Sequence, residues 1–181
     1  MAHRVRNYRK RNYITPPVAV AVGAALSICA IAFSHSTPRR ALFVWNASAS
    51  APVGLYRVIH QRDVARGDLV LAIPNHSVAI FAAQRGYLPM GIPLVKRVVA
   101  VEGDTVCARG NGIFVNRIRL ATRLPADNKG RTLPSWTGCQ MLGGNDAFLL
   151  MAGVPDSFDG RYFGTTNTSN IAGRLVPIWT R

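Results

Sequence analysis

An uncharged apolar run close to the first residue limits how the rest of this chain can be organised. Residues 17–33, PVAVAVGAALSICAIAF, carry no charge, and with Ser34 and the residues just before it the run reaches the roughly 20 residues that span a bilayer as a helix. Basic residues crowd the preceding segment: Arg4, Arg6, Arg9, Lys10 and Arg11. Because such residues stay on the cytoplasmic side, we expect a basic cytoplasmic segment at 1–16, a transmembrane helix at 17–34 and an extracytoplasmic domain at 35–181. A removed signal peptide is the alternative, since Ala30-Ile31-Ala32 resembles a small-residue cleavage site.

The net charge of the chain is +14, and the basic residues of the leading segment supply part of it. The remaining Lys and Arg residues are scattered singly, without the aromatic-interleaved basic face of a nucleic-acid platform. We therefore expect no nucleic-acid partner. An attraction to anionic lipid headgroups explains the surplus, so a lipid bilayer is an expected partner.

The domain at 35–181 is expected to be mainly β. Short β-rich stretches alternate with Gly, Pro, Asn and Asp turns, which predicts strands at 41–45, 55–59, 69–73, 94–101, 112–116, 148–151 and 174–179. One short helix is expected at 78–87, where apolar residues recur at helical spacing. Between Cys107 and Phe148 periodicity is weak, which indicates an excursion of strands and loops.

Two of the three cysteines, Cys107 and Cys139, fall within this domain. An extracytoplasmic compartment is oxidising, and an even number of cysteines there favours a disulfide. Two free buried thiols are the alternative.

Candidates for chemistry are few. The four histidines are unclustered and the cysteines lack zinc-site spacing, so no metal and no cofactor are expected. A serine hydroxyl needs a base, and a lysine can serve if burial lowers its pKa. Lys96 alone among the three lysines lies in an apolar stretch, LVKRVVAV, where strand periodicity puts it on one face with Leu94 and Val98 and puts Arg97 on the other. The alternative is an edge-strand lysine that reaches solvent.

Four blocks then resemble the signal peptidase I superfamily, and within it the conjugative-transfer peptidases of TraF type: NASASAPVGLYRV, RGDLVLAIP, VKRVVAVEGDTVC and VPDSFDGRYFG. The resemblance implies a signal-peptidase-like antiparallel sheet in which Ser50 is the nucleophile and Lys96 the general base. It implies that Ser48 helps to form the oxyanion hole, although Ser48 as nucleophile stays an alternative. In the last block, it implies supporting roles for further residues: Ser157 would orient the Lys96 amine, and Asp159 would pair with Arg161 or Arg97.

These inferences predict a membrane-anchored serine endopeptidase of the bacterial inner membrane, with a single span and a periplasmic catalytic domain. The resemblance implies that it processes, and can cyclise, a pilin precursor for conjugative transfer, with the protein substrate bound as an extended strand. The alternatives are a general preprotein signal peptidase and a non-enzymatic membrane-tethered component of the secretion channel. The related self-cleaving repressors fit less well, because this chain has no DNA-binding module.

Overall fold

The structure is a computed structural model that describes residues 16–36, 41–60 and 63–181. The chain divides into two units, 1–40 and 41–181. In the first unit, helix α1 (Pro16–Ser36) extends over the run that was expected to span a membrane. Among the described residues, however, no helix is both long enough and apolar enough to cross a bilayer. The membrane anchor therefore stays a prediction of the sequence, and the basic segment at 1–16 lies outside the described residues except for Pro16.

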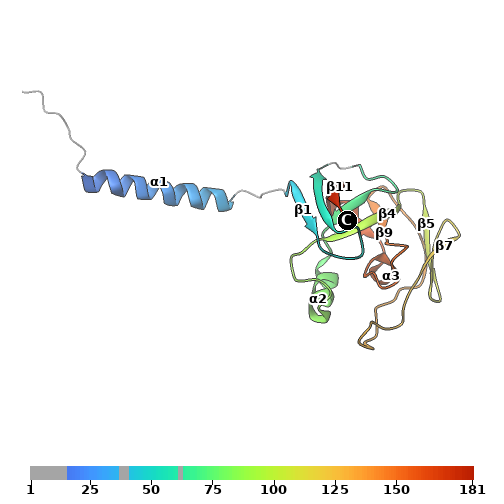
Figure 1. Ribbon diagram of the computed structural model, residues 1–181. Coiled ribbons are helices and arrows are strands. Elements are labelled where there is room, and N and C mark those ends of the chain that lie inside the picture. Colours follow the sequence, from blue (N-terminus) through green and yellow to red (C-terminus); the bar gives the residue numbers. More distant parts are fainter. Residues whose placement is uncertain (1–15, 37–40, 61–62) are drawn as a thin grey trace, which may run out of the picture. The chain divides into compact units, whose positions relative to one another are not determined.

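The second unit contains two antiparallel sheets (Figure 1). The larger has seven strands in the order β1-β2-β11-β3-β4-β9-β10. Its strands are β1 (Phe43–Asn46), β2 (Gly54–Ile59), β3 (Leu69–Ala72), β4 (Leu94–Ala100), β9 (Asp146–Leu149), β10 (Thr166–Asn167) and β11 (Ile171–Thr180). The smaller has the order β7-β6-β5-β8, with β5 (Thr105–Arg109), β6 (Gly112–Val115), β7 (Ile118–Thr122) and β8 (Gly138–Met141). Helices α2 (His76–Arg85) and α3 (Gly160–Phe163) and the short 3-10 turn η1 (Thr168–Asn170) lie in the connections.

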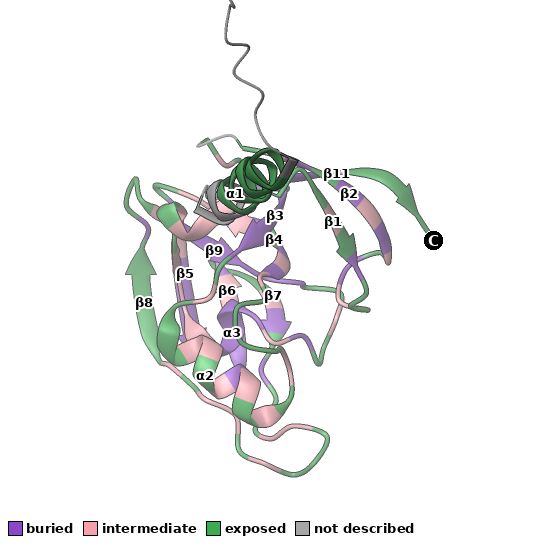
Figure 2. Cartoon of the chain, turned by 90° about the vertical axis from the view of Figure 1, so that its left-hand side faces the viewer, coloured by how far each residue is buried: buried purple, intermediate pink, exposed green. Residues whose placement is uncertain are grey.

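The two sheets share a core. Phe148 and Leu150, at and just after β9, pack with Val106 and Ile113 of the smaller sheet, and all four are fully buried. Strands β3, β4 and β9 are largely buried, whereas β8 is exposed along its whole length (Figure 2). Strands β3, β4 and β9 therefore form the buried centre of the larger sheet.

The mainly β prediction is confirmed, with differences in detail. The sequence predicted only an excursion of strands and loops between Cys107 and Phe148, and it did not locate β5, β7 or β8 individually. Strand β8 is exposed at every residue, so it has no apolar alternation to detect. Helix α2 begins two residues earlier than expected, since the Asn75 side chain caps it by accepting a hydrogen bond from Val78 N. It ends at Gly86, whose φ of 71° is the left-handed conformation typical of a helix end. The expectation of a single helix was wrong, because Asp159 caps the additional short helix α3.

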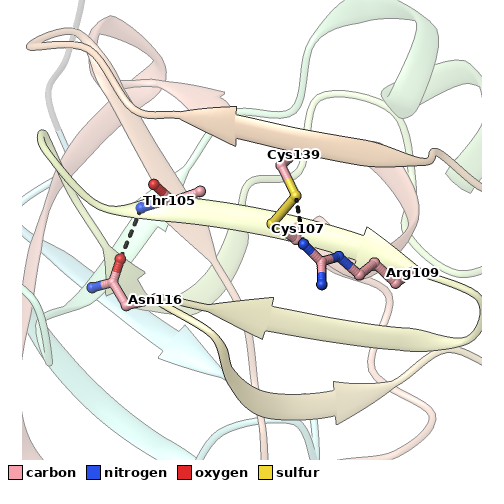
Figure 3. The surroundings of a disulfide bond; sticks show 5 residues. All are labelled: Thr105, Cys107, Arg109, Asn116 and Cys139. Carbon is pink, nitrogen blue, oxygen red and sulfur yellow. Dashed lines mark hydrogen bonds between the residues drawn. A yellow bond between two sulfur atoms is a disulfide. The ribbon is translucent and has the colours of Figure 1, made fainter.

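A disulfide joins Cys107 of β5 to Cys139 of β8, as the even cysteine count predicted (Figure 3). The two residues are directly opposite each other in the antiparallel register. Arg109, on the same strand as Cys107, donates a weak hydrogen bond to the Cys139 sulfur at 3.7 Å. In the described part of the chain β8 pairs with β5 alone, so the disulfide is the covalent tie of this edge strand.

Candidate active site

The turn that carries Ser48 and Ser50 is shaped by Asn46, the last residue of β1. Its side-chain amide donates to the carbonyl oxygens of Ser48, Ala51 and Pro52, each at 3.0 Å. Its side-chain oxygen accepts a hydrogen bond from Ser48 N at 3.1 Å. Asn46 is 4% exposed, so these bonds are shielded from water. One buried amide thus fixes the path of the backbone on both sides of Ser50.

Lys96 of β4 reaches this turn from the facing part of the sheet. Its Nζ donates to Ser50 Oγ at 3.2 Å and to Ser157 Oγ at 2.9 Å. Ser48 Oγ lies 2.9 Å from Ser50 Oγ and 3.3 Å from Ser50 N, from which it accepts a hydrogen bond. Two hydroxyls from distant segments, Ser50 and Ser157, therefore contact one amine, and a third hydroxyl, Ser48, contacts Ser50.

The Lys96 amine is held in an environment that disfavours its charge. The side chain is 4% exposed, and the strand alternation expected from the sequence is observed, with Leu94, Val98 and Ala100 buried on the same face. Burial lowers the pKa of Lys96 from 10.5 to about 8, although the charge of Asp159 opposes this shift. About a tenth of the amine is consequently neutral at pH 7, and about half at pH 8, and this fraction can accept a proton.

A buried ion pair lies behind Ser157. Asp159 and Arg161 are both fully buried, and Arg161 Nε donates to Asp159 Oδ1 at 2.8 Å. Arg161 also donates to the carbonyl oxygens of Pro155 and Met151, at 2.8 and 2.9 Å, and Asp159 accepts from Met151 N at 3.0 Å. The pair therefore ties both ends of the segment that leads into Ser157.

Arg97 does not contact Asp159, although it lines the smaller of two cavities beside Ser50. Of the two partners considered for Asp159, the structure selects Arg161, and Arg97 instead donates to the Gly67 carbonyl at 2.6 Å. The reason is the strand period, which turns the exposed Arg97 to the face opposite Lys96. The sequence correctly put Arg97 on that face but left its pairing open, and a direct contact with Asp159 was the wrong alternative.

Two cavities meet at Ser50. The larger, about 850 Å³, is lined by Ser50 and Lys96, by the turn that carries Ser48 and Ser50, and by apolar side chains that include Leu71, Ile92 and Leu133. The smaller, about 520 Å³, is lined by Ser50, the residues that follow it, and the 150–154 segment. A chain that contacts Ser50 can thus extend into a cavity on either side of it.

One edge of β4 is available beside this larger cavity. Residues Leu94–Lys96 pair with β3 on one side, whereas pairing with β9 begins only at Val98. Within the described ranges no strand occupies the other edge of Leu94–Lys96. An extended peptide could therefore add to this edge through main-chain hydrogen bonds, opposite the 44–50 segment that lines the same cavity.

Sequence reasoning missed two residues of the site. Asn46 had been taken only as the end of a strand, although an Asn followed two residues later by Ser is a signal for local side-chain to backbone bonding. Asp156, which lines the larger cavity, was overlooked because a lone acidic residue in a turn is usually solvated. The predicted residues form one chain of hydrogen bonds, in the order Ser48, Ser50, Lys96 and Ser157.

The fold and this cluster define a class of protein. The chain belongs to the signal peptidase family, peptidase S26, whose profile matches residues 12–180.

Particular relatives are plasmid and conjugal transfer proteins. The chain is 35% identical over 178 residues to a plasmid transfer protein TraF of Escherichia coli, an alignment that covers 92% of this chain and 96% of that protein. It is 33% identical over 144 residues to a conjugal transfer protein TraF of Agrobacterium fabrum, covering 75% and 81% of the two chains. Among solved structures, a signal peptidase I of Enterococcus faecalis matches 63% of this chain and 97% of its own, with 19% identity and a TM-score of 0.36.

Proposed function

We propose that this protein is a serine endopeptidase in which Ser50 is the nucleophile and Lys96 the general base. The observation that carries the proposal is the contact between a buried amine and a hydroxyl, Lys96 Nζ to Ser50 Oγ, at 3.2 Å. A lysine with a pKa of about 8 is about one-tenth neutral at pH 7 and can act as a base, whereas an ordinary lysine, with a pKa of about 10.4, is less than about one-thousandth neutral. Membership of the signal peptidase family supports the same chemistry.

The first step is attack on the substrate carbonyl. Neutral Lys96 takes the Ser50 proton while Ser50 Oγ forms the new bond, and the carbonyl oxygen becomes an oxyanion. Ser50 N–H and the Ser48 hydroxyl, which are already adjacent, are the donors that would stabilise it. The Ser157 hydroxyl, at 2.9 Å, holds the amine in line with Ser50 throughout.

Breakdown of the tetrahedral intermediate follows. The ammonium of Lys96 gives its proton to the leaving amine, and an ester remains on Ser50. Water hydrolyses this ester to yield a cleaved chain, whereas an amine at the substrate's own N-terminus would close a cyclic product. In both cases Lys96 accepts the proton of the attacking group.

The substrate we propose is a precursor protein handled in conjugal transfer, with a pilin precursor as the first candidate. Relatives of the chain are named plasmid transfer and conjugal transfer proteins, which supports this setting. The free edge at Leu94–Lys96 and the two cavities on either side of Ser50 favour an extended segment.

The test is processing of a pilin precursor by wild type and by single variants, with product masses read by mass spectrometry. Ser50→Ala and Lys96→Ala should abolish processing, and Ser48→Ala should slow it about 100-fold, the typical loss for one oxyanion donor. Lys129→Ala is the matched control, because this exposed lysine does not line either cavity. A product one water lighter than the linear chain would identify cyclisation.

Two rival functions predict different results, one for cleavage of other substrates and one for conjugation by the same variants. A general preprotein signal peptidase would process exported preproteins as readily as the pilin precursor. A non-enzymatic channel component would support conjugation equally well after Ser50→Ala or Lys96→Ala.

We further propose, from the sequence, that residues 17–34 anchor the protein in the bacterial inner membrane with 35–181 in the periplasm. The apolar run and the basic residues before it support this topology. Extraction of membranes with alkaline carbonate should leave the protein in the pellet, and protease added to spheroplasts should degrade the domain at 35–181. Release by carbonate, or protection from the protease, would refute this topology.

A further inference from the structure

The larger cavity beside the dyad has an uneven distribution of charge. Three of its lining residues are ionisable as acids or amines: Lys96, Asp127 and Asp156. The rest of the lining is mostly apolar or hydroxyl-bearing. A substrate group that enters the cavity therefore meets few charges, so each charge has a large effect on which groups bind.

Asp127 is already neutralised by its surroundings. Arg131 Nε donates to it at 2.8 Å, and Tyr87 Oη donates to the same carboxylate. Burial alone would raise the pKa of Asp127, but these hydrogen bonds hold it below its usual value. The negative charge of Asp127 is thus paired with Arg131, and these contacts stabilise the wall of the cavity.

Asp156 is different. It is exposed, lines the cavity, and among the described residues has no hydrogen-bond or ion-pair partner. Its backbone position is nevertheless fixed: the Pro155 carbonyl accepts from Arg161 at 2.8 Å, and Ser157 N donates to the Val154 carbonyl at 3.2 Å. The backbone that carries this carboxylate is therefore held at a defined point, one residue from the hydroxyl that contacts Lys96.

The state of Lys96 during catalysis sharpens this contrast. The base form of Lys96 is neutral, so in the reactive enzyme Asp156 is the one unpaired charge among the described cavity residues. The protein as a whole is strongly cationic, with a net charge of +14. A single unpaired carboxylate in the larger cavity of a cationic protein favours a cationic ligand group.

Resting on the proposed peptidase function, we propose that Asp156 is a specificity-determining residue that binds a cationic group of the peptide substrate. The chemistry is that of an ammonium or guanidinium group, which has two sources: a Lys or Arg side chain near the scissile bond, or a free N-terminal amine. A charge-assisted hydrogen bond to a carboxylate at the cavity wall would align either group beside Ser50.

The test measures kcat/KM on synthetic peptides with small residues at the scissile bond. One series carries lysine, norleucine or glutamate at each flanking position in turn, with an acetylated N-terminus. A second series carries norleucine throughout and has either a free or an acetylated N-terminus. The enzymes are the full-length wild type, Asp156→Asn, Asp156→Arg and the control Asp63→Asn, which removes an exposed carboxylate that does not line the cavity.

We expect wild type and Asp63→Asn to prefer lysine over norleucine by about five- to tenfold at one position, as for a partly exposed ion pair. Asp156→Asn should bring that ratio close to one, and Asp156→Arg should shift the preference to glutamate. If the preference follows the free N-terminus instead, the cationic group is the α-amine, and the proposal stands with that source.

Asp156 also raises the pKa of Lys96 through its charge, so Asp156→Asn has a second effect that must be separated from binding. A change in the base alters kcat/KM by the same factor on every peptide. An equal change across the whole series, with the lysine-to-norleucine and amine-to-acetyl ratios intact, would overturn the proposal. If wild type cleaves none of the peptides although it processes a pilin precursor, the peptides are replaced by precursor variants with the same substitutions, and the same ratios decide. If wild type processes neither, the proposed function itself is refuted.

Discussion

Replacing Lys96 by methionine should make the folded domain more stable below about pH 8. Burial lowers the pKa of Lys96 from 10.5 to about 8, and at 1.36 kcal/mol per pH unit this corresponds to about 3 kcal/mol of unfavourable free energy in the native state while the amine is charged. Methionine has a similar length and packs without a charge. It leaves Ser157 and Ser50 without the amine, at about 1 kcal/mol for each lost hydrogen bond. The expected net gain is about 1 kcal/mol.

The pH dependence separates this account from a simple packing effect. The native amine releases its proton near pH 8 and the unfolded amine near 10.5, so between these values the unfolded chain binds more protons and the stability of wild type rises with pH. The rise should be about 2 kcal/mol between about pH 7 and pH 9.5, and the variant should lack it. The advantage of the variant should therefore vanish, and then reverse, as pH is raised.

Urea denaturation followed by tryptophan fluorescence measures this directly. All three tryptophans, Trp45, Trp136 and Trp179, lie in the 41–181 unit, so the signal reports that unit. Lys129→Met is the control, since this lysine is exposed and its replacement should change stability by less than about 0.5 kcal/mol. A stability difference between wild type and Lys96→Met that stays constant from pH 7 to 9.5 would refute the reasoning.

Three further predictions concern the same domain. The kcat/KM for peptide cleavage should rise about tenfold per pH unit below pH 8, as Lys96 loses its proton, and should level off above pH 8. A profile that is flat from pH 6 to 9 would contradict a lysine base. Asp159→Ala should destabilise the domain by about 3–5 kcal/mol in urea denaturation, because it leaves Arg161 charged and fully buried. Adding Arg161→Met should recover part of this loss. A single variant as stable as wild type would argue against a stabilising ion pair. Gly160→Ala should lower the free energy of unfolding by about 1–3 kcal/mol, since the new Cβ would lie 2.7 Å from the Leu149 carbonyl oxygen. Gly153→Ala should leave thermal unfolding nearly unchanged, because nothing lies within 4 Å of its Cβ position. Similar melting temperatures for the two variants would contradict this packing.

The parts of the site that could be predicted are those with a local signal. Lys96 was identified because strand periodicity and the scarcity of lysines pointed to one position, and the structure gives it the expected buried face. The choice of Arg161 over Arg97 as partner of Asp159 depended on how the 151–161 segment folds back on itself, which no local pattern encodes. Asn46 bonds to residues two to six positions ahead, so its signal was present but was read only as a strand end.

The fold shows the same division. Strands with a buried face, such as β3 and β4, were predicted almost to the residue. The exposed β8 was missed because its position depends on pairing with β5 across a separation of 32 residues between the cysteines, and not on its own composition. Long-range pairing of this kind is supplied by tertiary structure alone.

The position of β11 in the larger sheet has a consequence for the order of events during synthesis. This strand, residues 171–180, lies between β2, which follows the Ser50 turn, and β3, which pairs with the Lys96 strand. A ribosome makes it after every residue of the cluster, so the Ser50 and Lys96 segments of a nascent chain lack the strand that connects β2 to β3 in the sheet. The contact between Lys96 and Ser50 should therefore form only after β11 has closed the sheet, so the order of synthesis delays assembly of the proposed site until the rest of the domain has been made.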